Sequence, residues 1–354
     1  MASDVQNSDR RRFLGGLVGA ALATAGCGSS CGSARAGRGE NHVSTVVTKT
    51  EAVRVAVPQG KPRVVVVRTK RALTEGYDAD AGATRAMLDA GLVALSGEKD
   101  HVAALLRYFR PDERIGLKIN GLAGRNAATH VELVDAISAM LVKAGVEGRR
   151  QIAFDRFARD LTASRIIDRS RNGGYRAIGN DDAGHDDEFV QMPSSASRLS
   201  RVLTHQVDGV LNLPVLKQHM LAGMTGALKN NFGCIHNPNK MHVDNCDPYV
   251  AEVNAVPAIR NKQRLVIMDA LRPVVDNGPS YQPGMAEVAN AMLFSTDLVA
   301  IDTVALGILE GLRAKRDLPP LAKVGLLPTY LATATRLGLG VSDRAGIEVV
   351  EIEV

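Results

Sequence analysis

The chain has 354 residues, of which 45% are hydrophobic and 23% are charged, so it can bury a full core in one large domain or two smaller ones. The formal net charge is +5, but lysine and arginine are spread along the chain, which argues against a nucleic-acid-binding protein with a basic stripe. Tryptophan is absent and aromatic residues make up 4%, which argues against aromatic-lined grooves for sugars or single-stranded nucleic acid.

Residues 1–26 have the features of a twin-arginine signal peptide. Arg10-Arg11 precedes an apolar stretch over residues 14–25, which is too short to span a bilayer. We therefore expect the twin-arginine export machinery to be a partner and the mature protein to be periplasmic. Twin-arginine export carries folded proteins, so a cofactor inserted before export is compatible with this route but is not required.

The sequence around Cys27 predicts how the exported protein begins. Thr24-Ala25-Gly26-Cys27 resembles a lipobox, which predicts a lipid anchor on Cys27 as the only membrane contact. Ala23-Thr24-Ala25 alternatively fits simple cleavage by a signal peptidase. The residues that follow, 27–60, begin with a Gly/Ser-rich run and are expected to form a flexible tether.

The rest of the chain alternates apolar strands with amphipathic helices. Strands are expected at 63–68, 114–119, 151–154, 207–213, 264–268, 290–294 and 347–352, and helices at 82–95, 101–109 and 297–313. Another helix is expected to follow Thr129 as its N-cap, because apolar residues after it recur on one helical face. We therefore predict an α/β fold with a mostly parallel sheet flanked by helices, in a single large domain over residues 61–354.

Residues 168–200 interrupt this alternation, because they are polar and rich in glycine. A solvated connection or a lid is expected there, and a division of the domain into two lobes would fall in this segment. The stretch 180–187 combines aspartates with His185, a composition that also suits a divalent metal, although its spacing is not that of an EF-hand.

Polar side chains are expected where the apolar strands end. They are Lys118 and Asn120, Asp155, Lys217 and His219, and Asp269. Lys229 and Asn230 are expected on the helix that follows the strand at 207–213. Because open parallel sheets bind ligands outside the carboxyl ends of their strands, we expect these side chains to converge. Gly233 is expected to end the short helix that carries Lys229.

Three lysines near one another repel unless a carboxylate, a bound anion or a depressed pKa relieves them. We expect a small anionic ligand, with His219 as proton carrier and Lys217 and Lys229 stabilising negative charge. The expected ligand-binding residues are Lys118, Asn120, Asn230, Asp155, Asp269 and Asp302. The alternative is that each lysine pairs separately with an acid or caps a helix, and that Asp302 pairs with a nearby arginine or lysine.

Cys234, His236, His242 and Cys246 form a second group of chemically capable residues. All four types bind zinc, although the spacing matches no standard structural site. Cys234 and Cys246 alternatively form a disulfide, or remain separate thiols. The other two cysteines, Cys27 and Cys31, belong to the expected tether, so a four-cysteine iron–sulfur cluster within the domain is not expected.

The sequence also resembles a known family. The pattern Leu213-Pro214-x-x-Lys217-x-His219, followed by Thr225-Gly226-Ala227-Leu228-Lys229-Asn230-x-Phe232-Gly233, resembles the DUF362 family (domain of unknown function 362). The resemblance extends over roughly residues 60–310 and includes Ile115–Asn120 and Ser295–Asp302. Some members of this family carry ferredoxin-like cysteine clusters, which this chain lacks.

Taken together, these features predict an exported enzyme or binding protein for a small anionic ligand, whose cofactor is unknown. The competing prediction is a non-catalytic periplasmic lipoprotein that binds a partner or assists in handling a metal or cofactor.

Overall fold

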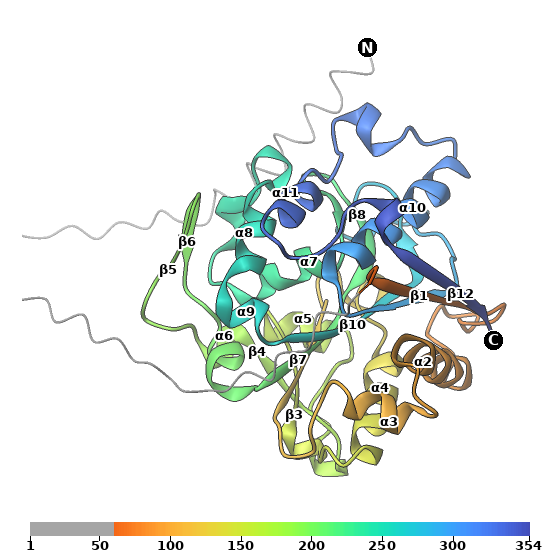
Figure 1. Ribbon diagram of the computed structural model, residues 1–354, viewed down its shortest axis with the longest axis vertical. Helices are drawn as coiled ribbons and strands as arrows, with labels where there is room; N and C mark the ends of the chain where they lie inside the picture. The colour runs from red at the N-terminus through yellow and green to blue at the C-terminus, as the bar shows by residue number, and fades with distance from the viewer. Residues whose placement is uncertain (1–59) are drawn as a thin grey trace, which may run out of the picture. The chain divides into compact units, whose positions relative to one another are not determined.

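A ten-stranded sheet forms the centre of the structure, a computed structural model that describes residues 60–354 (Figure 1). The main path through the sheet has the order β12-β1-β11-β10-β7-β2-β3-β4, and β8 pairs with β10 and with β9 off this path. The strands are β1 (Arg63–Arg68), β2 (Ile115–Ile119), β3 (Gln151–Asp155), β4 (Arg176–Gly179), β7 (Gly209–Leu213), β8 (Val215–His219), β9 (Gly223–Thr225), β10 (Gln263–Val274), β11 (Ala291–Ser295) and β12 (Glu348–Glu353).

Most strand pairs are parallel, which confirms the predicted fold class. β4, β3, β2, β7 and β10 run parallel to one another, as do β1 and β12. β11 is antiparallel to both β1 and β10, and β9 is antiparallel to β8. The helices are α2 (Ala81–Ser96), α3 (His101–Leu106), α4 (Val131–Lys143), α5 (Ala158–Ala163), α6 (Asn180–Ala183), α7 (Ala227–Asn230), α8 (Tyr249–Ala255), α9 (Pro257–Arg260), α10 (Leu298–Ala314) and α11 (Tyr330–Arg336).

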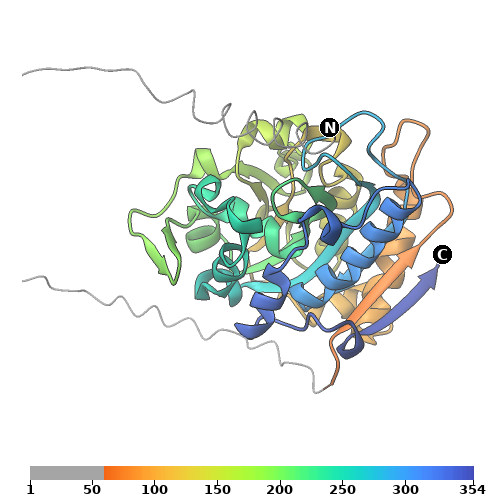
Figure 2. The ribbon, with the colours of Figure 1, turned by 90° about the horizontal axis from the view of Figure 1, so that it is seen from above.

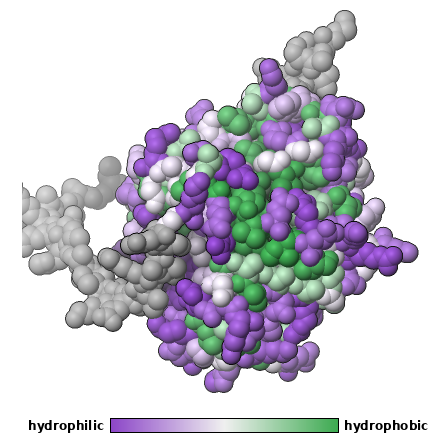
Figure 3. Space-filling view, turned by 45° about the vertical axis from the view of Figure 1, so that its right-hand side comes forward, coloured by the Kyte–Doolittle hydropathy of each residue, from purple (hydrophilic) through white to green (hydrophobic). Residues whose placement is uncertain are grey.

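Both faces of the sheet are covered, which explains the apolar runs in its strands. In β1, Val65 and Val67 pack into the core beneath α2, α3 and α4, whereas Val64 and Val66 pack into the core beneath α10. Figure 1 shows these helices on opposite sides of β1. A third core joins β3 and β7 to α8 and α11. On the face shown in Figure 3, apolar residues lie between broad hydrophilic areas.

Among the element boundaries that differ from those expected, three lie close to the candidate residues, and two of these move candidate residues. The chain resumes as β8 directly after Pro214, so Lys217 and His219 lie on a strand instead of after one. β10 continues to Val274, because its second half pairs with β8, so Asp269 lies inside it. Helix α4 has His130, not Thr129, at its N-cap position.

Residues 168–200 do not divide the described chain into two lobes. Their first strand, β4, pairs with β3 in the main sheet, and the rest includes a hairpin of β5 (Val190–Met192) and β6 (Ser195–Ser197). Seen from above, this light-green hairpin stands out at one side (Figure 2).

The expected signal peptide and nearly all of the tether lie outside the described residues. None of the helices from residue 60 onward is both long enough and apolar enough to cross a bilayer.

Candidate functional site

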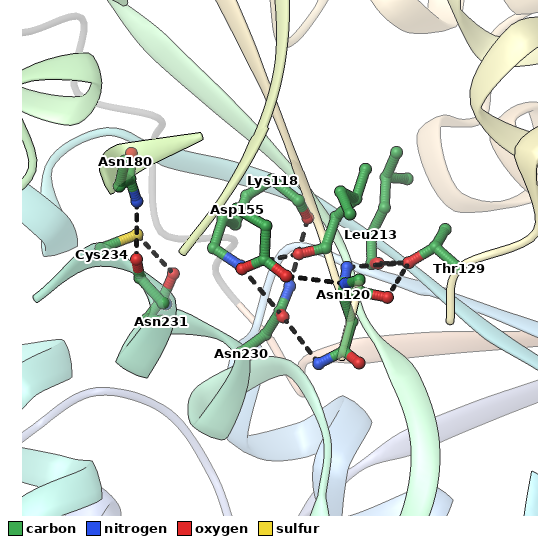
Figure 4. A network of polar contacts seen from close by, with 12 residues as sticks. Lys118, Asn120, Thr129, Asp155, Asn180, Leu213, Asn230, Asn231 and Cys234 are labelled. Carbon is green, nitrogen blue, oxygen red and sulfur yellow. Dashed lines mark hydrogen bonds and ion pairs between the residues drawn. The ribbon is translucent and has the colours of Figure 1, made fainter. Parts of the chain in front are cut away.

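Lys118 and Asp155 form a buried ion pair at the ends of neighbouring strands (Figure 4). Lys118 Nζ lies 2.8 Å from Asp155 Oδ1, 2.7 Å from the Ile119 carbonyl and 3.2 Å from Asn230 Oδ1. The second carboxylate oxygen of Asp155 accepts a hydrogen bond from Gly121 N at 2.7 Å. All three ammonium protons of Lys118 therefore have a partner in the protein.

The three ammonium protons of Lys217 also have acceptors, although within residues 60–354 none of these acceptors is a carboxylate. Its Nζ donates to Asn120 Oδ1 at 2.7 Å and to the carbonyl oxygens of Leu122 and Ala127 at 3.1 and 2.9 Å. Burial lowers the pKa of Lys217 to about 7. Asn120 also donates to Asn230 Oδ1 at 3.2 Å, so the networks of the two lysines are joined.

Asn230 holds the short helix α7 against strands β2 and β7. Its amide donates to the Lys118 carbonyl at 3.1 Å and to Asn212 Oδ1 at 2.8 Å, which ties α7 to β2 and β7. Thr129 also connects β2 with β7. Its hydroxyl accepts a hydrogen bond from the N–H of Asn120, which follows β2, and donates one to the carbonyl of Leu213 at the end of β7. Its expected role as an N-cap is wrong, since its side chain bonds to the sheet instead.

Close packing against neighbouring side chains requires a glycine at position 233, and its role is not to end a helix. Its φ is not positive, and a 3₁₀ turn over Asn231–Cys234 continues through it. A Cβ placed on it would lie 2.5 Å from Asp155 Oδ1 and 2.9 Å from Lys118 Nζ. The expected C′ role is therefore wrong, and the glycine instead lets the backbone press against the ion pair.

Asp269 is paired with His130, a residue that the sequence analysis did not single out. Asp269 Oδ2 accepts from His130 N at 2.9 Å and lies 2.7 Å from His130 Nδ1. Burial opposes the charge on the imidazole, but Asp269 outweighs it and raises the pKa of His130 to about 9. Likewise, burial would raise the pKa of Asp269, but His130 holds it below its usual range. The pair fixes the N-terminus of α4 to β10.

Lys229 differs from the other two lysines in having spare hydrogen-bond donors. Its Nζ makes one hydrogen bond, to His242 Nε2 at 2.9 Å, and lies 4.2 Å from the centre of the Phe232 ring. Burial lowers its pKa to about 8. Within residues 60–354 no carboxylate forms an ion pair with it.

His242 and His219 stack beside this lysine, with ring centres 5.5 Å apart and planes at 22°. His242 Nδ1 lies 2.9 Å from the Pro238 carbonyl, so Nδ1 carries the proton and Nε2 accepts from Lys229. Burial, followed by the charge of Lys229, lowers the pKa of His242 to about 3.

His219 is held as a neutral ring, which argues against its expected role as a proton carrier. Its Nδ1 accepts backbone hydrogen bonds from Leu221 N at 3.1 Å and Ala222 N at 3.2 Å, so its single proton lies on Nε2. Burial, then the charges of Lys229 and Lys217, keep its pKa well below the usual value. Nε2–H is therefore a hydrogen-bond donor, and the ring does not readily gain a second proton.

Among residues 60–354, Asp302 forms no ion pair with a cationic side chain. Its two carboxylate oxygens accept from Ala227 N at 2.6 Å and Leu228 N at 3.0 Å, which caps the first turn of α7. Burial raises its pKa to about 7. Gly226 makes this approach feasible, because a Cβ on it would lie 2.2 Å from Asp302 Oδ1. Both roles proposed for Asp302 from the sequence are wrong, because its partners are backbone N–H groups.

The predicted metal site at Cys234, His236, His242 and Cys246 does not form. Both cysteines are free and buried, so the alternative disulfide is wrong as well. In the part of the chain that the structure describes, no three His, Cys, Asp or Glu side chains are arranged to hold a metal ion. The reason is that His242 is engaged by Lys229, whereas His236 packs against His185 with ring centres 5.0 Å apart.

The family model for a domain of unknown function, DUF362, matches residues 115–307, more than half of the chain. The chain belongs to the DUF362 family. Every lysine and histidine of the site described above lies within the matched segment. The family model assigns no activity to these residues.

Two further similarities involve single proteins. Over 245 residues, the chain is 27% identical to the thylakoid-associated protein sll1697 of Synechocystis sp., a match that covers 63% of this chain and 71% of that protein. A crystal structure of a Thermotoga maritima protein from the Northeast Structural Genomics Consortium is similar with a TM-score of 0.39 and 8% identity. That match covers 74% of this chain and 60% of the other.

Proposed function

We propose that the protein binds a small anionic ligand at a site formed by Lys229, His219 and His242, and that Lys229 is the group that exchanges a proton with it. We propose further that the protein is exported by the twin-arginine pathway and held at the membrane through Cys27. The name of the thylakoid-associated relative supports a location connected with a membrane.

The unequal hydrogen bonding of the three lysines carries this proposal. Lys118 and Lys217 each use three donors on protein acceptors, whereas Lys229 uses one. A buried ammonium group without a carboxylate costs several kcal/mol in effective desolvation, and a bound anion would offset this cost. Arg156 adds positive charge near Lys229, because it lowers the pKa of both Lys229 and His242.

The same lysine suits proton transfer. A pKa of about 8 leaves it mostly charged at neutral pH, with roughly a tenth of the molecules carrying the free amine. The free amine is a base or a nucleophile, and the charged form binds an anion. His219 supplies a second donor through Nε2–H, which makes no hydrogen bond within residues 60–354.

Substituting the lysines separately tests the proposal. In Lys229→Met the buried charge disappears, so the melting temperature without ligand should rise, by an amount that corresponds to at most about 3 kcal/mol. Inorganic phosphate, sulfate and acetate should stabilise the wild-type protein against heat and should not stabilise this variant.

Lys217→Met is the matched control. It removes a lysine of similar burial but leaves three buried acceptors unpaired, so stability should fall by about 3 kcal/mol. Anions should still raise the melting temperature of the Lys217→Met variant as they do for the wild-type protein. If Lys229→Met kept the full anion shift, or if no anion stabilised the wild-type protein, binding at Lys229 would be refuted.

A further inference from the structure

A second group of basic side chains lies next to this site, and within residues 60–354 none of them forms an ion pair with a carboxylate. It comprises His185, Arg198 and His236, together with Arg156, and is called the outer basic group below. The His185 and His236 rings pack edge to face at 5.0 Å. Arg198 and His236 lie on adjacent backbone segments, because His236 N donates to the Arg198 carbonyl at 2.9 Å.

Three nitrogen atoms of the outer basic group are buried without a hydrogen-bond partner among residues 60–354. They are Arg156 Nε, His185 Nε2 and Arg198 Nε. Arg156 makes a single side-chain hydrogen bond, from Nη1 to Asn239 Oδ1 at 3.3 Å, and the Arg198 guanidinium stacks 4.8 Å from the centre of the Phe189 ring. Buried polar atoms without hydrogen-bond partners are uncommon in folded proteins, and an absent ligand is one explanation for them.

The carboxylates near this group are already engaged elsewhere. Asp186 bonds to His205 Nε2 at 2.9 Å, and Asp187 pairs with Arg201 at 3.3 Å. Asp181 accepts from Ala158 N at 2.9 Å, and Asp155 is bound to Lys118. Asp160 lies near Arg156 but pairs with Arg159 at 3.7 Å. Within residues 60–354, the two arginines of the outer basic group therefore form no ion pair with a carboxylate.

Arg156 connects the outer basic group with Lys229. Its charge lowers the pKa of His185 as well as those of Lys229 and His242, so it acts on both groups. Asn239, its hydrogen-bond partner, belongs to the 3₁₀ turn Pro238–Met241, which directly precedes His242.

From this juxtaposition we infer that the outer basic group is a second anion-binding position, and that the ligand is a small molecule with two anionic groups, carboxylates or phosphates. One anionic group binds at Lys229 and the other at Arg198, His185 and His236, with Arg156 between them. The inference rests on the proposed function and specifies its ligand class.

The test compares ligands with one and with two anionic groups. Titration calorimetry of the full chain would use acetate and butyrate against succinate, glutarate and adipate, and inorganic phosphate against pyrophosphate. The wild-type protein should bind at least one doubly anionic ligand about tenfold or more tightly than its matched single anion, because two anion positions act together.

Arg198→Gln and His236→Gln should each reduce the ratio of the affinity for the doubly anionic ligand to the affinity for its matched single anion. His236 is exposed, so its replacement should leave the fold intact. Arg201→Gln is the matched control, because Arg201 is a nearby arginine already paired with Asp187, and it should leave the ratio unchanged. Lys229→Met should abolish binding of both ligand classes.

Single anions that bind in a Lys229-dependent way, without any preference for two charges, would overturn this inference and leave the proposed function standing. A preference that survives both Arg198→Gln and His236→Gln would also overturn it. Absence of all binding to the wild-type protein would refute the proposed function itself.

Discussion

Lys217 and Lys229 show how residues of one type, both buried and twelve positions apart in the sequence, acquire different roles. The acceptors of Lys217 include the carbonyl oxygens of Leu122 and Ala127, which come from a loop almost a hundred positions earlier. Sequence patterns place polar side chains at strand ends, but they do not show which backbone carbonyls will be free to accept. The expected proximity of Lys118, Lys217 and Asn230 is present in the structure, but the sequence could not rank the three lysines.

The His130–Asp269 pair was missed for a related reason. A histidine before a helix carries no periodic signal, and Asp269 is expected to interact with lysines as readily as with an imidazole. The actual pairing depends on β10 running past Asp269, which follows from its pairing with β8.

This pair makes a specific prediction about stability and pH. The pKa of His130 is raised from 6.5 to about 9, so its contribution is fully present below pH 6.5 and is lost as the pH rises through 9. Between pH 7 and pH 9 the loss should amount to about 2 kcal/mol of unfolding free energy.

Lys217 and Lys229 have lowered pKa values and titrate in the same window with the opposite sign. The quantity to measure is therefore the difference in urea-unfolding free energy between the wild-type protein and His130→Gln/Asp269→Asn. That difference should shrink from pH 7 to pH 9, and a constant difference would show that the pair does not titrate as described.

At the scale of elements, α7 is the part that brings the site together. It has only four residues, too few to be stable alone, and it is held by Asp302 at its first turn and by Asn230 at its last. The helix was expected from the sequence, but its anchor was not, because Asp302 lies more than seventy positions away and acts on backbone N–H groups.

Gly226→Ala should break this anchor. The added methyl group would lie 2.2 Å from Asp302 Oδ1, so the carboxylate must move away from Ala227 N and Leu228 N. We expect a loss of about 2–4 kcal/mol in urea unfolding.

A double-mutant cycle with Asp302→Ala would identify the cause. Once the carboxylate is gone the methyl group has room, so the two losses should be clearly less than additive. Strict additivity would mean that Gly226 is needed for some reason other than Asp302.

At the scale of the molecule, the predicted α/β class and the mostly parallel sheet are confirmed, because long buried strands leave an unmistakable apolar signature. The short strands β4, β5, β6 and β9 were not expected from the sequence. They have three or four residues each, a length at which no periodicity can be recognised.

Export is the prediction that concerns the whole protein in its cell. Replacing Arg10 and Arg11 by lysine should leave the unprocessed precursor in the cytoplasm, because the machinery recognises the arginine pair. Fractionation and immunoblotting would measure this, with Arg35→Lys and Arg38→Lys together as a matched control outside the motif. Normal processing of the Arg10/Arg11 variant would rule out the twin-arginine route.

The position of β1 in the sheet has a consequence for how the chain is made. Both of its neighbours come from segments much later in the chain, β11 at Ala291–Ser295 and β12 at Glu348–Glu353. During translation β1 therefore lacks both of these partners until those segments have been synthesised. Pairings this distant in sequence form slowly and late. A secretion route that translocates an unfolded polypeptide during synthesis would act before this part of the sheet has formed. A route that transports folded proteins would act after the sheet is complete.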